Sequence, residues 1–235
     1  MAEPGRIAFC DFEKREEMTP DQVAEVFTKV AGTYDETWKA RHYKDHVYVA
    51  EAVADFYPGD RASVQVLDVG AGTGMLAEEL WGKGFRLIDG LDPSHGMKVE
   101  ASKKGVYTNY YTEFMDGKRL DCFATDAYDC LVVAAAFNTG FIPCAALPEM
   151  TRLVKPDGLI CFGIPDSRFT EVKDYVDRLA PLMELMEEQG VWELVDTKYC
   201  HDFYDNANPG NIFRYVVKAS DIDAAKFIDR LGPVG

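Results

Sequence analysis

The apolar positions of this chain fall into short continuous runs, separated by segments in which apolar residues recur at helical spacing. Continuous apolar runs bounded by turn residues are typical of strands that are buried on both faces. Strands are therefore predicted over 63–69, 85–91, 106–111, 128–135 and 158–164. Helices are predicted between them over 74–83, 94–103 and 143–154. Alternating strands and helices indicate a parallel sheet with right-handed crossovers.

The last third of the chain has a different order of elements. A predicted helix over 168–189 is followed by two strands, 191–200 and 211–220, with turn residues between them and no helix. Consecutive strands joined in this way pair antiparallel, so the sheet is expected to end in a hairpin. Ahead of the sheet, residues 19–57 have the pattern of two or three helices, with Thr19 as a helix cap and Pro20 at the first helical position.

These elements predict an α/β fold: a doubly wound, mostly parallel seven-stranded sheet with an antiparallel C-terminal hairpin and a helical N-terminal extension. A chain of 235 residues is long enough for one domain with a substantial core. We expect a single domain over 1–235. It divides into a helical extension or lid (1–60), a core (61–220) and a C-terminal tail (221–235).

Composition narrows the classes of partner. The chain has 25 basic and 40 acidic residues and a net charge of −15, which disfavours nucleic acid as a partner. No apolar run is long enough to span a membrane, and residues 1–17 lack the pattern of a secretory signal. The six cysteines show no CxxC or zinc spacing, which favours a reducing, cytoplasmic location.

The stretch "VLDVGAGTGM" (66–75) carries the main chemical signal. Glycines at 70, 72 and 74 allow a sharp turn after a strand and expose backbone N–H groups to a ligand. The third glycine of the dinucleotide fingerprint is replaced here by Met75, and no phosphate loop of the GxxxxGK[ST] form is present. Asp68 before the turn would repel a pyrophosphate and attract a cation. S-adenosylmethionine is cationic, carries an adenosine and has no phosphate.

"VLDVGAGTG" also resembles the first motif of the class I S-adenosylmethionine-dependent methyltransferases, which have a Rossmann-like fold. The resemblance implies S-adenosylmethionine as cofactor and S-adenosylhomocysteine as product. The turn residues would hold the methionine and ribose portions, with Asp68 near the ammonium group; they are Asp68, Gly70, Ala71, Gly72 and Gly74. The run "FNTGFIPCAALPEMTRLVKPDGLICF" is most similar to the methyltransferase-like family of the Williams-Beuren syndrome region.

A second carboxylate follows at the end of the second predicted strand. Asp92, in "LIDGLDPSHGM", comes twenty residues after Gly72, where an acidic side chain can accept both ribose hydroxyls. Its alternative role is the cap of the following helix, before Pro93. The same resemblance places Pro93 beside the cofactor and Met97 on the adenine, although Met97 also suits the core. Near the third strand, the adenine amino group would be contacted by Thr112 or Glu113.

Further residues are candidates for cofactor or acceptor contacts. "AYDCLVVAAAFNTG" resembles the family's fourth motif, so Ala136, Phe137 and Asn138 would face cofactor and substrate. "VAGTYDETW" resembles the segment in which a tyrosine covers the cofactor, here Tyr34. Trp38, one turn later, either closes over the pocket or packs in the core. The loop "CHDFYDNANPG" is expected to overhang the strand ends and offers three acceptor-binding candidates: His201, Asp202 and Tyr204.

These features lead to three hypotheses about function. The first is transfer of a methyl group from S-adenosylmethionine to a small molecule by in-line displacement, with no catalytic base assigned. The alternatives are a nicotinamide-dependent oxidoreductase and a catalytically silent S-adenosylmethionine-binding partner protein. His42 and His46 have metal-ligand spacing but no third ligand, so no metal is expected. The acidic stretch 166–196 is either a solvated face or an attraction for a cationic acceptor; the oligomeric state is not predicted.

Overall fold

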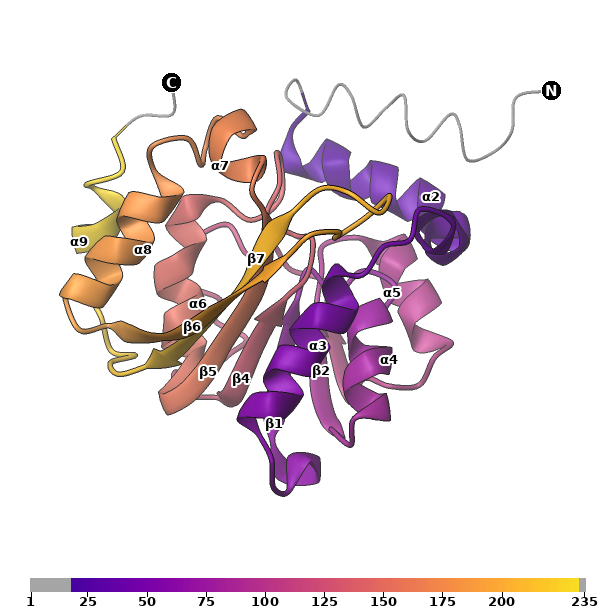
Figure 1. Cartoon of the computed structure of the whole chain (residues 1–235), viewed down its shortest axis with the longest axis horizontal. Helices are drawn as coiled ribbons and strands as arrows, with labels where there is room; N and C mark the ends of the chain where they lie inside the picture. Colours follow the sequence, from indigo (N-terminus) through magenta and orange to yellow (C-terminus); the bar gives the residue numbers. More distant parts are fainter. Residues whose placement is uncertain (1–17, 233–235) are drawn as a thin grey trace.

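A seven-stranded sheet runs through the molecule in the order β3-β2-β1-β4-β5-β7-β6 (Figure 1). This computed structural model describes residues 18–232, so the expectation about a signal in residues 1–17 lies outside the described part. The first five strands pair in parallel, and β7 pairs antiparallel with both β5 and β6. The strands are β1 (Gln65–Val69), β2 (Leu87–Leu91), β3 (Asn109–Tyr111), β4 (Tyr128–Val133), β5 (Val154–Pro165), β6 (Trp192–Cys200) and β7 (Gly210–Val217). The predicted α/β fold with its C-terminal hairpin is confirmed.

Helices cover both faces of the sheet (Figure 1). On one face α3 (Asp45–Phe56) and α4 (Met75–Gly82) pack on the strand residues that include Val66 and Val132. On the other face α6 (Leu147–Leu153) and α8 (Leu179–Glu188) pack around Leu67 and Leu131. Because successive strand residues point to opposite faces, the continuous apolar runs supply both cores at once. The shorter helices are α5 (His95–Ser102), α7 (Arg168–Glu171), α9 (Ala225–Ile228), η2 (Arg61–Ser63) and η3 (Cys144–Ala146).

The single helix predicted over 168–189 is wrong. The structure has two helices there, α7 and α8, separated by turns. Asp177 adopts a φ of 54°, which interrupts a right-handed helix. Tertiary hydrogen bonds also hold this segment away from helical geometry: Tyr175 donates its hydroxyl to the carbonyl of Ile142 at 2.5 Å, and Asp174 accepts from the amide of Cys144 at 2.7 Å. These contacts are invisible in a local periodicity.

Helix α2 (Pro20–Ala40) is held across the carboxyl ends of the strands (Figure 1). It begins as predicted, with Thr19 as the cap in a capping box and Pro20 in the first turn. Its middle packs on α5, where the hydroxyls of Thr28 and Ser94 lie 2.9 Å apart. A Cβ atom on Gly96 would lie 2.3 Å from the carbonyl oxygen of Thr28. Glycine at position 96 therefore permits the close approach of these two helices.

The sheet leaves a crevice where its strand order reverses. From β1 the chain continues to β2 and β3 on one side, whereas β4 and β5 lie on the other. In open α/β sheets, ligands bind outside the carboxyl ends of the strands at such a reversal. Helix α2 lies over this place, so a ligand there would be enclosed between the strand ends and α2.

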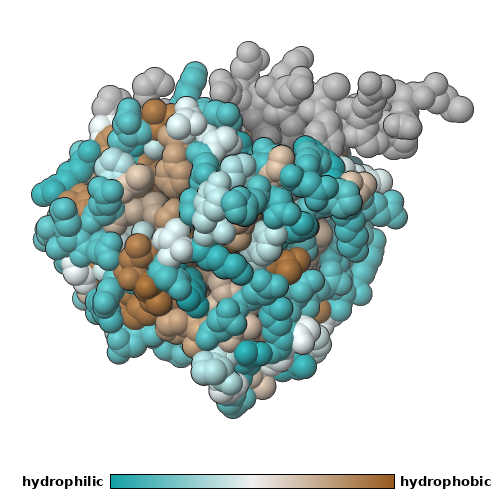
Figure 2. Space-filling model, in the orientation of Figure 1, coloured by the Kyte–Doolittle hydropathy of each residue, from teal (hydrophilic) through white to brown (hydrophobic). Residues whose placement is uncertain are grey.

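The face drawn in Figure 2 is mostly hydrophilic, with apolar side chains in small separate patches. Between residues 18 and 232, no helix combines the length and the apolar composition that a bilayer crossing requires. The apolar residues of greatest interest are therefore those that line internal cavities.

We predict that Gly96→Ala lowers the free energy of unfolding by about 1–3 kcal/mol, because the new methyl group collides with the backbone of α2. Urea denaturation measures the change, and limited proteolysis tests whether α2 is released first. Gly82→Ala is the matched control: Gly82 is also helical, but a Cβ atom there meets nothing within 4 Å. Equal stability of the two variants would contradict the close packing of α2 on α5.

Candidate functional site

The glycine-rich turn between β1 and α4 lies at the carboxyl end of the sheet. Gly70, Gly72 and Gly74 have φ angles of 73°, 53° and 88°, in the left-handed region that glycine adopts without steric cost. A Cβ atom on Gly70 would also lie 2.3 Å from the Cβ of Ala136, so the turn packs directly against the end of β4. On its other side, the amide of Gly70 donates to the carbonyl of Leu91 at 2.8 Å. The turn is thus fixed between the ends of β2 and β4.

Asp92 follows β2 and joins the glycine turn to α5. Its Oδ2 accepts from the amide of Gly72 at 3.1 Å, and its Oδ1 accepts from the amide of Ser94 at 2.8 Å. The cap of α5 is Ser94, whose hydroxyl accepts from the amide of Met97, so the alternative role of Asp92 as the cap is wrong. A carboxylate oxygen has about two acceptor directions, and each oxygen of Asp92 uses only one for the protein. The others remain for ligand hydroxyls.

Asp68, in β1, is a buried carboxylate with a single hydrogen-bond donor among the described side chains. The hydroxyl of Tyr107 donates to its Oδ2 at 2.7 Å. Burial raises the pKa of Asp68 to about 7 against the effect of this hydrogen bond, and the nearby charge of Asp92 adds to the rise. Burial also raises the pKa of Asp92 to about 6, although two backbone amides favour its charged form. Within residues 18–232 neither carboxylate forms an ion pair, so the site favours a cationic ligand.

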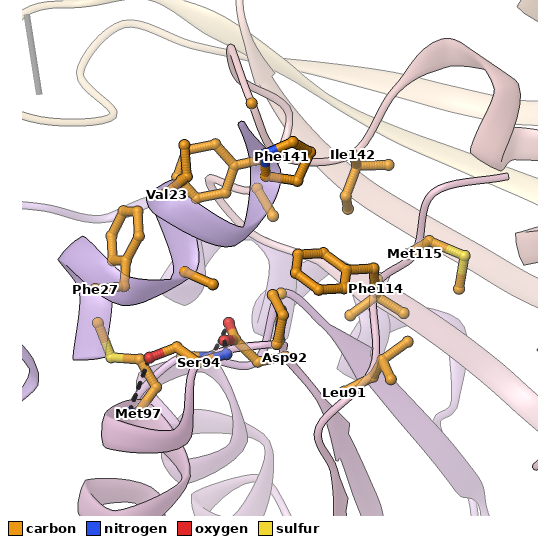
Figure 3. Close-up of a pocket in the computed structure, with 18 of the residues that line it drawn as sticks. Val23, Phe27, Leu91, Asp92, Ser94, Met97, Phe114, Met115, Phe141 and Ile142 are labelled. Atoms are coloured by element: carbon orange, nitrogen blue, oxygen red, sulfur yellow. Dashed lines mark hydrogen bonds between the residues drawn. The ribbon is translucent and has the colours of Figure 1, made fainter. Parts of the chain in front are cut away.

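An apolar cavity of about 730 Å³ opens beside Asp92, and we call it the inner cavity. Figure 3 shows the carboxylate of Asp92 pointing toward it from below and the ring of Phe114 facing it from the loop after β3. Helix α2 contributes Val23 and Phe27, and Met97 closes the side formed by α5. Other apolar residues of the lining are Leu91, Met115, Phe141 and Ile142. This lining suits a ligand that has a flat apolar group for the cavity and hydroxyl groups next to it that can donate to Asp92.

A second, smaller space lies against the glycine turn, and we call it the loop pocket. It is lined by Asp68, Thr73, Tyr34, Tyr43 and His46, together with the backbone of the turn. The Nδ1 atom of His46 is buried and has no hydrogen-bond partner. Burial lowers the pKa of His46 to about 4, so its ring is neutral at physiological pH. A neutral imidazole nitrogen without a partner is a ready hydrogen-bonding group for a polar ligand.

A third space of about 1070 Å³ lies between α2, β4 and the β6–β7 hairpin, and we call it the outer cavity. Its lining is largely aromatic and includes Trp38, Phe137 and Tyr204. Its polar members are Arg41, Asp45, Asn138 and Arg168. Tyr34 lines all three spaces, and Phe27, Ala135 and Phe141 line both the inner and the outer cavity. The inner and outer cavities therefore adjoin at the end of β4.

Asp45 fixes the backbone at this junction. Its Oδ2 accepts from the amide of Ala135 at 2.7 Å, and Ala135 has a φ of 54°, which is unfavourable for a residue with a side chain. The other oxygen, Oδ1, is buried and has no hydrogen-bond partner among residues 18–232. A Cβ atom on Gly163 would lie only 1.9 Å from this oxygen, so glycine at position 163 leaves room for the carboxylate. Burial raises the pKa of Asp45 to about 7.

Comparisons with known proteins agree with this geometry. Residues 67–162 match a family model described as a methyltransferase domain. The chain is 28% identical over 167 residues to human methyltransferase-like protein 27, covering 71% of this chain and 66% of that protein. It is 33% identical over 146 residues to demethylmenaquinone methyltransferase from Renibacterium salmoninarum, covering 59% of this chain and 56% of that protein. Over residues 67–162 the chain therefore resembles the S-adenosylmethionine-dependent methyltransferases, with which it shares its fold.

A solved methyltransferase has the same fold. Magnesium protoporphyrin IX methyltransferase from Synechocystis, with S-adenosylmethionine bound, superposes with a TM-score of 0.55 and 18% identity, covering 74% of this chain and 80% of that one. The matched stretches span between about half and two thirds of the two curated relatives, 56% and 66% of their lengths. The narrower resemblance to the Williams-Beuren syndrome region family stays a prediction.

The structure brings most of the predicted cofactor residues together. The inner cavity is lined by Tyr34, Gly70, Gly72, Asp92, Pro93, Met97, Glu113 and Ala136. The loop pocket adds Asp68 and Ala71. Two predicted residues line none of the three spaces: Gly74, which caps α4, and Thr112. Of the two candidates near the third strand, only Glu113 thus faces the inner cavity.

The predicted acceptor residues separate into two groups. Trp38, Phe137, Asn138 and Tyr204 line the outer cavity. His201 and Asp202 are not among the residues that line it. His201 is exposed with its ring against Tyr199, 4.9 Å between centroids, and Asp202 accepts from Lys44 and from the hydroxyl of Tyr48. Neighbouring residues of an extended loop point in different directions, and an ion pair holds Asp202 against α3.

Several residues of the site were missed from the sequence. Tyr107 and Tyr110 lie in a β-prone run, and their hydroxyls donate to Asp68 and to the carbonyl of Gly72. Asp45, His46 and Arg168 come from elements far along the chain from the glycine turn, so no local motif marks them. His42 and His46 do not share a helix face, because His42 lies in the turn after α2 with a φ of 53°.

The raised pKa of Asp68 predicts a pH-dependent stability. The folded state binds this proton more tightly than the unfolded state, so stability from this group is full below about pH 4 and is lost as the pH rises to about 7. Asp68→Asn removes the ionisation, so the ligand-free variant should gain about 1–3 kcal/mol relative to the wild type across this range. Thermal unfolding at several pH values measures it. Asp121→Asn, whose side chain is 98% exposed, is the control. A constant difference between wild type and Asp68→Asn would refute the prediction.

Proposed function

We propose that this protein binds S-adenosylmethionine across the inner cavity and the loop pocket and transfers its methyl group to a small molecule in the outer cavity. The observation that carries the proposal is the pair of carboxylates formed by buried Asp68 and half-buried Asp92, which have no cationic partner in residues 18–232 and lie at the ends of neighbouring strands. A dinucleotide would bring a pyrophosphate to the same place, where two negative charges repel it.

The residues of the site fit the proposed cofactor. The two remaining acceptor directions on Asp92 suit the ribose hydroxyls, and the apolar inner cavity suits the adenine. Asp68 suits the ammonium group. In the loop pocket, the unpartnered Nδ1 of His46 marks a place for a further polar group. Gly70 and Gly72 line the inner cavity and the loop pocket, where the turn presents backbone without side chains to a ligand.

Bound S-adenosylmethionine supplies an electrophilic methyl group on a sulfonium. The protein's contribution is to align acceptor and methyl group and to exclude water. Tyr34, Phe27 and Phe141 lie between the inner and outer cavities and are placed for both tasks. Ala135, fixed by Asp45, forms the floor shared by the two cavities. No residue is assigned as a general base.

The lining of the outer cavity supports a small-molecule acceptor, since a concave and mostly aromatic pocket with a few polar groups is typical of small-molecule sites. We also propose that, of the predicted extension 1–60, the described residues 18–60 form the cover of the site and that 61–220 form its core, since α2 lines both cavities. The five cysteines within residues 18–232 are all free, which supports a reducing, cytosolic compartment.

The proposed cofactor is tested by calorimetric titration. The wild type should bind S-adenosylmethionine and S-adenosylhomocysteine, whereas Asp68→Asn and Asp92→Ala should weaken binding by about tenfold or more, because each removes a charge-assisted contact. Asp121→Asn should bind like the wild type. Circular dichroism checks that the variants are folded. Folded wild-type protein that binds neither ligand would overturn the proposal.

Two further measurements separate the alternatives. Quenching or enhancement of NADH fluorescence on titration would favour a nicotinamide-dependent oxidoreductase, for which the comparisons offer no support. Cofactor binding without labelled-methyl transfer to any component of a metabolite extract would favour the catalytically silent partner protein.

A further inference from the structure

The outer cavity combines aromatic walls with a charged rim. Trp38, Tyr43 and Tyr204 form an edge-to-face or tilted set, with 5.5 Å between the centroids of Trp38 and Tyr43 and 6.1 Å between those of Trp38 and Tyr204. Phe137 and Phe203 complete the apolar lining. Aromatic walls of this kind bind flat apolar groups by burial and by ring contacts.

Two arginines reach this cavity, and their surroundings differ. Arg41 forms a bidentate ion pair with Asp205 and stacks over the ring of Trp38 at 5.1 Å, so its charge is neutralised within the protein. Within residues 18–232, Arg168 has no such bidentate partner. Its NH2 group lies 3.5 Å from the hydroxyl of Tyr204, at the limit of a hydrogen bond, and its NH1 group lies 4.0 Å from the carboxylate of Glu171.

The charge of Arg168 is therefore available to a ligand. Its side chain is only 19% exposed, whereas Glu171 is 66% exposed, and a surface pair at 4.0 Å contributes little. A guanidinium presents five donors in a planar fork, and in this geometry at most one of them is used by Tyr204. A planar anion matches the remaining donors and is bound more strongly here than in open water.

The negative groups of the cavity do not point to a cationic acceptor. Of the acidic stretch 166–196, the residue that lines the outer cavity is Arg168, and no acid of that stretch lines it. The carboxylate of Asp45 does line it, but Asp45 is tied to the amide of Ala135 at the floor and burial disfavours its charged form. The rim is thus positive, and the carboxylate at the floor is held by the backbone of Ala135.

We propose that the methyl acceptor is a small molecule with a flat apolar body and a carboxylate group, which Arg168 binds at the rim of the outer cavity. The apolar body lies between the rings of Trp38 and Phe137, and the atom to be methylated points toward Ala135, where the outer and inner cavities adjoin. This inference rests on the proposed function, because it names the class of acceptor for the same site.

Three matched probes test the inference: 2-naphthoate, the neutral 2-naphthamide and the cationic 2-naphthylmethylammonium. Each is titrated by calorimetry into full-length protein saturated with S-adenosylhomocysteine. The wild type should bind naphthoate about tenfold more tightly than the amide, and the ammonium compound least tightly. Arg168→Gln should remove the preference for naphthoate, and Arg168→Lys should keep part of it, because lysine retains the charge but not the fork.

Controls separate this inference from the cofactor assignment. Arg86 is an exposed arginine just before β2, at the amino end of that strand. The Arg86→Gln variant should bind all probes like the wild type. All variants should bind S-adenosylhomocysteine with unchanged affinity, which also shows that they are folded. The proposed acceptor class would be overturned if the wild type bound naphthoate and the amide equally, bound the ammonium compound most tightly, or bound none of the probes. It would also be overturned if Arg168→Gln kept the preference for naphthoate. Loss of S-adenosylhomocysteine binding by the wild type would instead overturn the proposed function.

Discussion

The site depends on two carboxylates, one buried and one half-buried, that have no counter-charge among residues 18–232. Burial in protein disfavours ionised Asp68 and Asp92 and raises the pKa of both. The fold accepts this cost because neighbouring groups hold the side chains in place: Tyr107 donates to one, and the amides of Gly72 and Ser94 donate to the other. A ligand that brings positive charge and hydroxyls relieves the cost. The electrostatic cost that lowers the stability of the ligand-free protein thus contributes to the affinity and selectivity for such a ligand.

Elements outside the core of the sheet decide what a ligand at these carboxylates meets. Helix α2 is drawn close to α5 through Gly96 and covers the inner cavity with Val23 and Phe27. Helix α3 contributes Asp45, whose bond to Ala135 shapes the junction of the inner and outer cavities. The β6–β7 hairpin brings Tyr204 onto Trp38. Cofactor contacts thus come from the strand ends, and the acceptor cavity is formed largely by α2 and the hairpin.

Net charge and local charge differ in this protein. The chain as a whole carries −15, yet the rim of the outer cavity holds two arginines, of which one is neutralised by Asp205. At physiological ionic strength, exposed charges are screened beyond roughly 8 Å, so a partly buried arginine dominates the field at its own cavity. Overall composition therefore argues against nucleic acid as a partner but does not determine the charge of a small acceptor.

The sequence by itself determined the alternation of strands and helices, the C-terminal hairpin, the glycine turn, and the carboxylates at its mouth and after β2. These features depend on local periodicity, turn residues and spacing along the chain, which a sequence records directly. Only the tertiary structure decided that Arg168, Asp45 and His46 line the cavities at the strand ends, whereas His201 and Asp202 do not. It also decided that the helix expected over 168–189 breaks in two. Such outcomes depend on side-chain direction and on hydrogen bonds between distant segments, as with Tyr175 and Ile142, which no local pattern contains.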